Sequence, residues 1–384
     1  MLRETELKLI DELLALKSGG GLFLEQAVAR NPVENYASQR RFERERRLMQ
    51  SLPRPLIHAS ELAEPGAFVR HNLLGLPVLL TRDEHGVVHA LVNVCRHRGT
   101  RLVDAAAGCQ HRFVCPYHAW TYNSSGALIA APHFEQGFGG LDRDALGLKS
   151  LPCQERFGLI WVQGLGDDSL DLDVWLGSLA PELEALRIEN MRVAYSDERP
   201  CAANWKLLIE GGIEAYHFRC AHRQTIGPHF EDNLSTFENF GPHMRSVLAR
   251  SNISGLDQLP REQWRLRDHA NLVYSLFPTD QLLLSQDHIT WIAPRPISAQ
   301  QSLMRMTTLV PTDGPLAAGK DAAHWRRNHR ISVSTFTEDM QICERIQSGI
   351  DAGACQQMLF GRFEGALRRF NQVMDDQLAR LESA

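Results

Sequence analysis

The chain has 384 residues, a formal net charge of −5 at pH 7 and a hydrophobic content of 43%. This length predicts two domains or one large one, with ample apolar residues for a core, and the small negative charge does not indicate nucleic-acid or anionic-membrane binding. No apolar run approaches membrane-spanning length, and the charged first segment does not resemble a signal peptide. We therefore expect a cytoplasmic protein with reduced cysteines.

The first 50 residues are predicted to form a helical segment. Leucines recur at helical spacing near its start, and arginine and glutamate alternate densely over residues 40–47, which is typical of a solvated helix face. From residue 51 to 165 the pattern changes to short apolar runs, such as 77–80 and 159–162, broken by Gly, Pro and Asp. This region is predicted to be a small all-β domain.

A stretch rich in glycine and aspartate at 164–168 is the predicted boundary with a second domain, residues 166–384. In that domain helical segments alternate with strand-like runs such as 281–284 and 304–310, and the chain ends in helices. The alternation predicts a larger α+β domain with an antiparallel sheet covered by helices. The expected fold class is therefore α+β, with a small all-β domain ahead of the larger one.

Two Cys–His pairs in the first domain have the spacing of an iron–sulfur site. They are Cys95 with His97, and Cys115 with His118. In a Rieske [2Fe–2S] cluster two thiolates hold one iron and two imidazoles hold the other, and the cluster is easier to reduce than an all-cysteine cluster. The motif therefore predicts a protein that accepts single electrons.

Two other interpretations of these four residues are open. Structural zinc sites commonly use C-x₂₋₄-C and H-x₃₋₅-H spacing, which the mixed pairs fit poorly. The four residues can also be unrelated. Turn-forming pieces argue against this, because Arg98-Gly99 follows the first pair and Pro116-Tyr117 lies inside the second, so that two loops can approach one cluster.

The runs 93–99 and 113–122, which contain these pairs, resemble the large (α) subunit of Rieske non-haem iron oxygenases. That family hydroxylates aromatic rings or oxidatively demethylates small substrates. It usually has Gly where this chain has Ala119. The resemblance implies one Rieske [2Fe–2S] cluster and one mononuclear Fe(II) per subunit, with dioxygen as co-substrate.

The resemblance also implies partners. A separate NAD(P)H-dependent reductase, directly or through a ferredoxin, delivers the electrons, and this chain has no G-x-G-x-x-G motif followed by an acid to bind the nucleotide itself. Within one subunit of the family the two metal centres are too far apart for fast electron transfer, which implies head-to-tail rings. A homotrimer is the expected assembly, and a small β subunit is left open.

A second iron site should combine two histidines and one carboxylate, the facial triad that leaves coordination positions open for dioxygen. His217 and His222 follow the run Asn204-Trp205-Lys206 and are the candidate histidines. Five residues on an ideal helix span about 140° of rotation, so the two side chains do not share a face. Their convergence needs a helix that loosens or ends between them, and residues 218–220 contain no obvious breaker. The pair is therefore implied by the resemblance.

Helical periodicity selects the carboxylate. The residues that share a helical face with Asp339 are Phe336, Ile342, Cys343 and Ile346. Its neighbour Glu338 faces mainly polar side chains instead. Because a carboxylate in an apolar layer is costly unless it is paired or metal-bound, Asp339 is the predicted iron ligand, with a buried salt-bridge partner as the alternative. The resemblance points to the same residue.

Glu214 lies three residues before His217, on the same predicted helical face and within hydrogen-bond reach. The resemblance implies that this acid bridges His217 to the cluster ligand His118 of the neighbouring subunit as an electron route; a solvated acid is the alternative. Just before it, Gly211 and Gly212 stand where many relatives have an asparagine. Each glycine in a helix lowers its stability by about 1 kcal/mol relative to alanine. The chain therefore departs from the family at the asparagine that contacts the iron site.

We expect the oxygenase component of a multicomponent Rieske oxygenase that hydroxylates or dihydroxylates an aromatic compound. The alternative is a monooxygenase or demethylase of a small quaternary amine or ether. A non-catalytic Rieske electron carrier is the alternative from a different class, although a carrier has no need of the downstream triad or its large domain. Four residues are pocket candidates on position alone: Phe218, His229, Phe230 and Trp291.

Overall fold

The computed structural model describes residues 1–166 and 169–383. Asp167 and Asp168, which belong to the predicted boundary, lie outside the described residues. All eight cysteines fall within the described part, and none of them forms a disulfide. None of the described helices is both long and apolar enough to cross a membrane.

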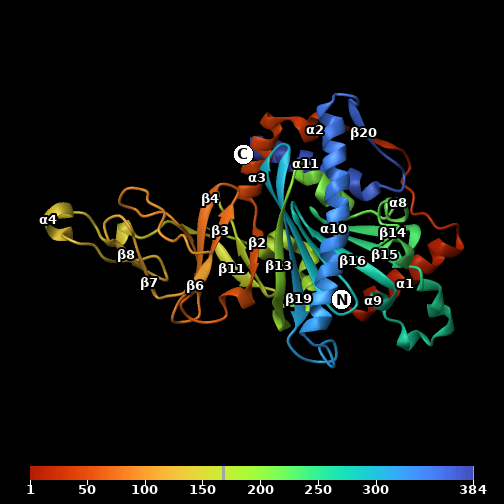
Figure 1. Ribbon diagram of the computed structural model, residues 1–384, viewed down its shortest axis with the longest axis horizontal. Helices are drawn as coiled ribbons and strands as arrows, with labels where there is room; N and C mark the ends of the chain where they lie inside the picture. Colours follow the sequence, from red (N-terminus) through yellow and green to blue (C-terminus); the bar gives the residue numbers. More distant parts are fainter. Residues whose placement is uncertain (167–168, 384) are drawn as a thin grey trace. The chain divides into compact units, whose positions relative to one another are not determined.

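The chain divides into two compact units, which are coloured along the sequence in Figure 1. The larger unit combines Met1–Leu48 with Leu176–Ala384, and the smaller unit is Met49–Trp175. The N-terminal helical segment therefore packs as part of the larger unit. The larger unit resumes at Leu176, later than the sequence-based boundary at residue 166.

The smaller unit is built from three antiparallel sheets of short strands. Their strand orders are β10-β5-β4-β3-β6, β11-β12-β2 and β7-β8-β9. The elements are β2 (Arg54–His58), β3 (Ala67–Leu73), β4 (Leu76–Arg82), β5 (Val88–Val92), β6 (Ala107–Cys109), β7 (Arg112–Val114), β8 (Thr121–Asn123), β9 (Leu128–Ala130), α4 (Phe134–Phe138), β10 (Ser150–Leu151), β11 (Cys153–Arg156) and β12 (Leu159–Val162). One further helix, α5 (Leu172–Leu176), lies where the sequence passes from this unit to the larger one.

Two apolar clusters form the core of the smaller unit. One cluster includes Val78 of β4 and Ile160 of β12, and so joins the five-stranded sheet to the β11-β12-β2 sheet. The other surrounds Cys95 and Cys115 with apolar and aromatic side chains, among them Trp120. The loops that carry the predicted cluster ligands are therefore anchored in a core rather than exposed on all sides.

A seven-stranded antiparallel sheet forms the centre of the larger unit, in the order β13-β19-β18-β17-β16-β15-β14. A separate two-stranded sheet pairs β1 with β20. The strands are β1 (Ala29–Pro32), β13 (Met191–Cys201), β14 (Phe230–Phe240), β15 (His243–Arg250), β16 (Ala270–Leu276), β17 (Asp280–Leu284), β18 (Ile289–Ser298), β19 (Gln301–Pro311) and β20 (Gln357–Phe360).

Helices pack around this sheet (Figure 1). They are α1 (Arg3–Ser18), α2 (Glu34–Ala37), α3 (Gln39–Ser51), α6 (Ala180–Leu186), α7 (Trp205–Gly211), α8 (Phe218–Ala221), α9 (Leu266–His269), α10 (Ala322–Asp351) and α11 (Gly365–Ser383). The predicted fold class, a small all-β domain and a larger α+β domain with a helix-covered antiparallel sheet, is confirmed.

The long helix α10 runs across one face of the sheet in Figure 1. It begins after Asp321, whose carboxylate accepts a hydrogen bond from the backbone N–H of His324 at 2.9 Å and so caps the helix. Its buried side chains recur every three or four residues, as Phe336 and Met340 do, and they share one core with side chains of β18 and β19. Asp339 lies next to Met340 and is largely buried.

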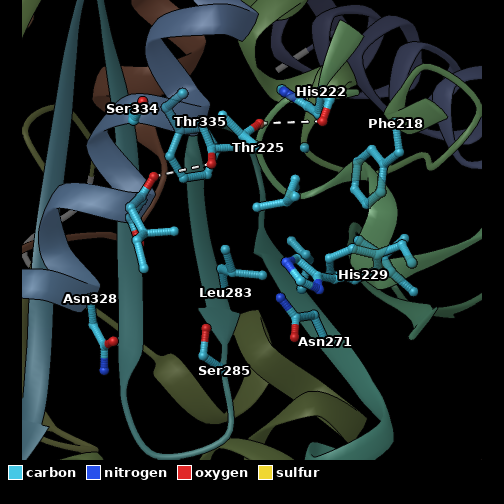
Figure 2. A pocket seen from close by; sticks show the side chains of 18 of the residues that line it. Phe218, His222, Thr225, His229, Asn271, Leu283, Ser285, Asn328, Ser334 and Thr335 are labelled. Atoms are coloured by element: carbon cyan, nitrogen blue, oxygen red, sulfur yellow. Dashed lines mark hydrogen bonds between the residues drawn. The ribbon is translucent and has the colours of Figure 1, made fainter. Parts of the chain in front are cut away.

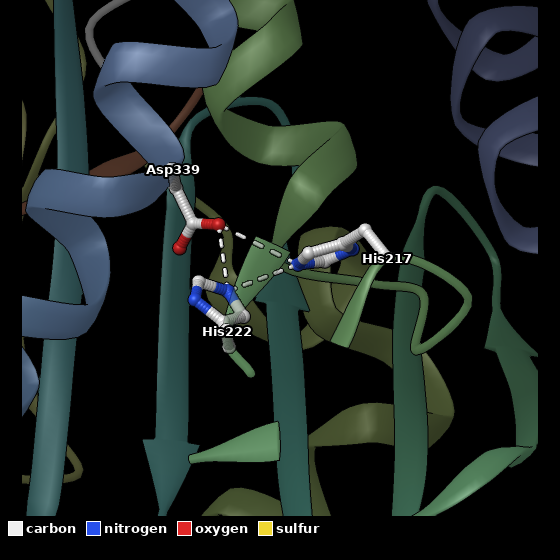
Figure 3. A group of neighbouring side chains, drawn as sticks. All are labelled: His217, His222 and Asp339. Atoms are coloured by element: carbon white, nitrogen blue, oxygen red, sulfur yellow. Dashed lines mark hydrogen bonds and ion pairs between the residues drawn. The ribbon is translucent and has the colours of Figure 1, made fainter. Parts of the chain in front are cut away.

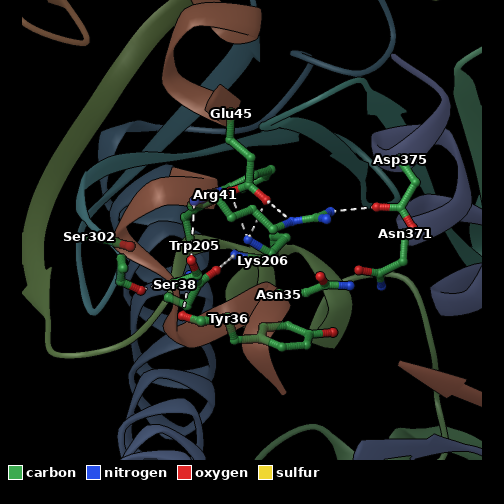
Figure 4. Close-up of polar contacts among 12 residues, drawn as sticks. Asn35, Tyr36, Ser38, Arg41, Glu45, Trp205, Lys206, Ser302, Asn371 and Asp375 are labelled. Atoms are coloured by element: carbon green, nitrogen blue, oxygen red, sulfur yellow. Dashed lines mark hydrogen bonds and ion pairs between the residues drawn. The ribbon is translucent and has the colours of Figure 1, made fainter. Parts of the chain in front are cut away.

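A buried ion pair joins α3 to α7 (Figure 4). Lys206 Nζ contacts both carboxylate oxygens of Glu45, at 2.9 and 2.8 Å, and neither side chain is exposed. Trp205 Nε1 and Arg41 Nε donate to the same carboxylate at 3.2 and 2.9 Å. Because a buried charge is costly without its partners, this network holds α7 firmly in the unit.

Glu210, near the end of α7, is a second buried acid. Its carboxylate accepts hydrogen bonds from the Tyr36 hydroxyl at 2.6 Å and from the Asn371 amide at 2.7 Å. Burial raises the pKa of Glu210 to about 7, although these hydrogen bonds act in the opposite direction. Glu210 is therefore a core carboxyl that gains or loses its proton near neutral pH.

Candidate functional site

The first candidate site is formed by two loops of the smaller unit, one after β5 and one after β7. Each loop closes on its own cysteine: the backbone N–H of Gly99 donates to the carbonyl of Cys95, and that of Ala119 donates to the carbonyl of Cys115, each at 3.0 Å. Ala119 has a φ of 58°, in the left-handed region that favours glycine. This conformation explains why a glycine is the usual residue at this position in the family that the sequence resembles.

The two loops bring the four predicted cluster residues together. Cys95 and Cys115 are 2% and 3% exposed, and the Nδ1 atoms of His97 and His118 lie 3.1 Å apart. Burial raises the pKa of the Cys95 thiol, and the nearby Cys115 thiol adds to this effect. Two buried thiols and two half-buried imidazoles that face each other are the donor set of a Rieske cluster.

Tyr122, on β8, contributes a hydrogen bond that the sequence did not suggest. Its hydroxyl accepts from the backbone N–H of Arg96 at 3.1 Å and lies 3.4 Å from Cys95 Sγ. Because the oxygen already accepts from Arg96, its own proton is free to donate to the sulfur. The available sequence signal was its place at the end of the run 113–122 that carries the second Cys–His pair, and this signal does not reveal a contact with Cys95.

The second candidate site lies in the larger unit, where His217, His222 and Asp339 converge (Figure 3). The two imidazole Nε2 atoms are 3.2 Å apart. Asp339 Oδ1 lies 3.4 Å from Nε2 of His217 and 2.9 Å from Nε2 of His222. Two imidazole nitrogens and one carboxylate oxygen that meet at one point are the donor set of a 2-His-1-carboxylate metal centre.

The local structure that brings the histidines together differs in part from the sequence-based expectation. Helix α7 ends at Gly211, before Glu214 and His217, whereas the sequence predicted one helix through these residues. The short helix α8 occupies only Phe218–Ala221, so a helix does end between the two histidines, as expected. His217 and His222 are the residues that flank α8 at its two ends. Because the backbone leaves helical geometry at His222, which has φ −104° and ψ 23°, the rotation of about 140° between helical positions five apart does not apply to this pair.

Gly212 is needed for a packing contact rather than for a turn. A Cβ atom at this position would collide with the side-chain amide of Gln281 on β17, whereas a Cβ at Gly211 would meet open space. Both glycines line the cavity described below. The two glycines therefore lie at the end of α7 and do not weaken its middle, and Gly212 leaves room for Gln281.

Two carboxylates orient the histidines by contacting their Nδ1 atoms. Glu214 accepts a short hydrogen bond from Nδ1 of His217 and is only 9% exposed, so it is not a solvated acid. Glu338 Oε2 lies 2.7 Å from Nδ1 of His222 and also accepts from the hydroxyl of Thr225 at 2.7 Å. A carboxylate on Nδ1 fixes the tautomer of an imidazole, so that Nε2 presents its lone pair to a metal ion.

Helical periodicity places Glu338 on the polar face of the helix and does not indicate a role for it at the site. The polar face is correct, but it is directed toward His222 and Thr225, more than one hundred residues away in the sequence. The available signal was a second acid directly beside the predicted ligand Asp339. That signal is weak, because adjacent acids are common on solvated helices.

The electrostatics of the triad follow from its carboxylates. Burial lowers the pKa of His217, but the hydrogen bonds to Asp339 and Glu214 outweigh it and raise the pKa to about 10. Burial raises the pKa of Asp339, but the hydrogen bonds to His217 and His222 outweigh this effect and bring the pKa below its ordinary value. The site thus favours positive charge at the point where Nε2 and Oδ1 meet, which is what a divalent cation supplies.

A cavity of about 560 Å³ opens beside the triad (Figure 2). His217, His222 and Asp339 are among its lining residues, and so are Phe218, His229 and Phe230, three of the four pocket candidates. The fourth candidate, Trp291, does not line the cavity. Trp291 is 2% exposed, and its Nε1 donates to Asp280 at 2.9 Å within the core.

Both units match known families. Residues 53–152 match the Rieske [2Fe-2S] domain, and residues 188–380, about half of the chain, match the catalytic domain of the ring hydroxylating alpha subunit. The two matched regions contain all the predicted cluster and iron residues.

Similar proteins agree with these matches. The glycine betaine monooxygenase oxygenase subunit of Chromohalobacter salexigens is 27% identical over 364 residues, which cover 84% of this chain and 80% of that protein. The anthranilate 1,2-dioxygenase large subunit of Acinetobacter baylyi is 32% identical over 202 residues, covering 47% of this chain and 41% of that protein. A solved quaternary ammonium Rieske monooxygenase, described for carnitine oxidation by gut microbiota and inter-subunit electron transfer, has the same fold with a TM-score of 0.74, 21% identity and coverage of 91% and 95% of the two chains.

Proposed function

This chain belongs to the ring-hydroxylating α-subunit family of Rieske oxygenases, and on that basis we propose that it is the oxygenase component of a monooxygenase that acts on a small quaternary ammonium compound. The observation that carries the choice of substrate is the similarity to a glycine betaine monooxygenase subunit along most of both chains. This reverses the order of the sequence-based expectations, in which an aromatic substrate came first.

Proteins of this family carry one Rieske cluster and one mononuclear iron, and the donor sets described above fit both groups. We assign Cys95, His97, Cys115 and His118 to the cluster, and His217, His222 and Asp339 to the iron. When bound, the cluster supplies single electrons and the iron supplies open coordination positions for dioxygen beside the substrate.

The chain's own residues prepare the iron site in two ways. Glu214 and Glu338 hold the Nδ1 atoms of the two histidines, so that both rings keep one tautomer and one orientation while the electron count at the site changes. Phe218 and Phe336 line the cavity with apolar surface and limit the water that can compete with substrate. A small organic molecule is therefore held next to the triad in a largely apolar space.

Electrons reach the iron site from another copy of the chain in this proposal. His118 of one subunit and Glu214 of the next would form the route, with Glu214 already hydrogen-bonded to His217. Such a route requires a closed head-to-tail ring, and a homotrimer is the simplest one. A separate NAD(P)H-dependent reductase, with or without a ferredoxin, would supply the electrons.

Aromatic ring hydroxylation is the second candidate function. The identity of 32% with an anthranilate dioxygenase subunit over 202 residues supports it, as do the phenyl rings of Phe218, Phe230 and Phe336 in the cavity lining. In this case the product would be a hydroxylated or dihydroxylated ring.

Oxygen uptake with a surrogate reductase and NADH tests both candidates and the alternative of an electron carrier. Quaternary amine oxidation predicts that glycine betaine or carnitine drives oxygen uptake. For glycine betaine, each O₂ consumed should give one formaldehyde, one dimethylglycine and one water, with two electrons drawn from NADH. Ring hydroxylation predicts uptake with anthranilate and no formaldehyde. About three irons per chain are expected; two irons and no substrate-dependent uptake would instead identify a carrier.

A further inference from the structure

Arg250 is a cationic side chain in the cavity lining that lacks an acidic partner. It is the last residue of β15 and is half-buried. Across the described residues 1–166 and 169–383, its guanidinium forms no ion pair within 4.0 Å and no hydrogen bond; its contact is with the ring of Phe230, 5.9 Å from the ring centroid. The carboxylate of Asp268 acts on it only from a distance and instead accepts a hydrogen bond from Gln286 at 2.7 Å.

The other charged groups of the lining are already neutralised by neighbours. Asp287 receives Lys320, His324 and His288, each at 2.8 Å. These contacts, against the effect of burial, hold the pKa of Asp287 far below its usual range. Since Asp339 belongs to the triad, the described lining offers no unpaired acid for a cation, and it offers one unpaired guanidinium for an anion.

Asn271 supplies a second polar group at the same place. It lies near the start of β16, next to the end of β15, where Leu248 pairs with Asn271 and Ala249 with Ala270. Figure 2 shows its side chain in the cavity lining, and its Oδ1 is buried without a hydrogen-bond partner. An amide can present either its oxygen or its NH₂ to a ligand, so this unsatisfied group is ready to take part in binding.

A series of ring contacts leads from Arg250 back to the triad. The ring of Phe230 lies 5.0 Å from that of Phe218, and the ring of Phe218 lies 5.6 Å from that of His222. Two phenyl groups therefore separate the cation from the proposed iron site. The cavity therefore has a cationic end at Arg250 and an end at the triad, with apolar surface between them.

We propose that Arg250, together with Asn271, binds the carboxylate of the substrate and thereby directs the opposite end of the molecule toward His217, His222 and Asp339. This inference rests on the proposed oxygenase function and narrows its substrate class to carboxylates. A guanidinium binds a carboxylate with two parallel hydrogen bonds, and such charge-assisted bonds are strongest where water is excluded. Zwitterionic quaternary amines and aromatic acids meet this requirement, whereas choline-like alcohols and neutral hydrocarbons do not.

Equilibrium binding tests the inference without reference to turnover. Isothermal titration calorimetry under anaerobic conditions would compare the iron-loaded protein with three probes that share a trimethylammonium group: glycine betaine, carnitine and choline. We expect at least one of the two carboxylates to bind about 10- to 100-fold more tightly than choline, the range for a hydrogen-bonded charge pair. Equal binding of choline and both carboxylates by the wild-type protein would overturn the inference.

Variants then assign the preference to one side chain. Arg250→Gln should bring the carboxylate-to-choline ratio close to one, and Arg250→Lys should retain part of it, because the charge remains while the planar fork is lost. Arg295→Gln is the matched control, since Arg295 lies on β18 of the same sheet, pairs with Glu198 at 3.8 Å and does not line the cavity. A full ratio in Arg250→Gln would overturn the inference; if that variant does not fold, an unchanged ratio in Arg250→Lys would do so.

The outcomes separate this inference from the proposed function. If no probe drives oxygen uptake but the ratio collapses in Arg250→Gln, the function fails and the carboxylate site stands. If formaldehyde is released equally from choline and from the carboxylates, the function stands and the inference fails.

Discussion

The two candidate metal sites are built on different principles. The cluster site draws its four residues from two loops close together in the sequence, and each loop is closed by a hydrogen bond to its own cysteine carbonyl. The iron site draws His217 and His222 from the ends of one short helix and Asp339 from the distant α10, and it depends on Glu214 and Glu338 for orientation. The first site is therefore local, and the second exists only when the larger unit is packed.

The surroundings of the two sites differ in the same way. Cys95 and Cys115 lie in an apolar and aromatic core. The helix that leads to the iron site contains Lys206 and Glu210, both buried and held by polar partners. A packed site whose supporting helix holds buried ionisable groups should respond more strongly to single substitutions and to pH than a local site in an apolar core.

Loss of the distant ligand is expected to have the largest effect. Asp339→Ala removes one of three donors, so iron should fall from about three to about two per chain, and substrate-dependent oxygen uptake should disappear while the visible spectrum of the cluster persists. Iron analysis and absorption spectroscopy measure both changes. Asp351→Ala, an exposed acid at the end of the same helix, is the control and should behave as wild type. Oxygen uptake that survives in Asp339→Ala would show that another residue provides the carboxylate.

The buried acid Glu210 makes the larger unit sensitive to pH. Its pKa is about 7 in the folded protein and near 4.5 as an ordinary glutamate, so the folded state holds a proton that the unfolded state has lost between these values. Stability should therefore fall as pH rises from about 4.5 to about 7, by at most about 3 kcal/mol.

Glu210→Gln should remove this dependence, because an amide oxygen can still accept from Tyr36 and Asn371 but does not ionise. Thermal unfolding by calorimetry at pH 5 and pH 8 measures it. Relative to wild type, the variant should gain stability at pH 8 and not at pH 5. An equal change at both pH values would mean that Glu210 keeps one protonation state throughout.

The orienting acid Glu338 should affect iron affinity more modestly. Glu338→Ala leaves Nδ1 of His222 and the hydroxyl of Thr225 without their shared acceptor. Loss of such a partner typically lowers metal affinity about 10- to 100-fold. Competition with a chelator measures the affinity, and Glu338→Gln should recover part of it. Unchanged affinity in Glu338→Ala would mean that the ring of His222 is fixed by packing alone.

The contrast between the sites also explains what the sequence could predict. The sequence suffices to predict the Cys–His pairs as ligands because their spacing is local. It suffices to predict Asp339 because helical periodicity directs this residue into an apolar layer. The roles of Glu338 and Arg250 cannot be predicted from the sequence, because the groups around them come from distant segments. The need for glycine at position 212 cannot be predicted for a similar reason: the collision of a Cβ at Gly212 with Gln281 depends on how β17 packs.

The strand order of the larger sheet cannot be predicted from the sequence for the same reason. The short apolar runs predicted strands and an α+β fold, and both are present. The pairing of β13 with β19, however, joins segments about one hundred residues apart, from Met191 with Pro311 to Cys201 with Ser302. Nothing local to either strand specifies its partner.

The smallest predicted effect concerns the local site and the hydrogen bond that Tyr122, on β8, makes to it. Tyr122→Phe removes the hydroxyl that lies 3.4 Å from Cys95 Sγ. A hydrogen bond to a cluster sulfur stabilises the more negative, reduced state, so its loss should lower the reduction potential. For a one-electron couple, about 1 kcal/mol corresponds to about 40 mV.

Redox titration of the cluster measures the shift, and Tyr117→Phe is the matched control. Its hydroxyl accepts from Arg98 at 2.9 Å on the exposed side of the loop and has no contact with either cysteine sulfur within the described structure. We expect a lower potential in Tyr122→Phe, wild-type potential in Tyr117→Phe and unchanged iron content in both. If both variants shifted equally, the potential would depend on the general polarity of the loops, and the cluster site would be less local than its hydrogen bonds indicate.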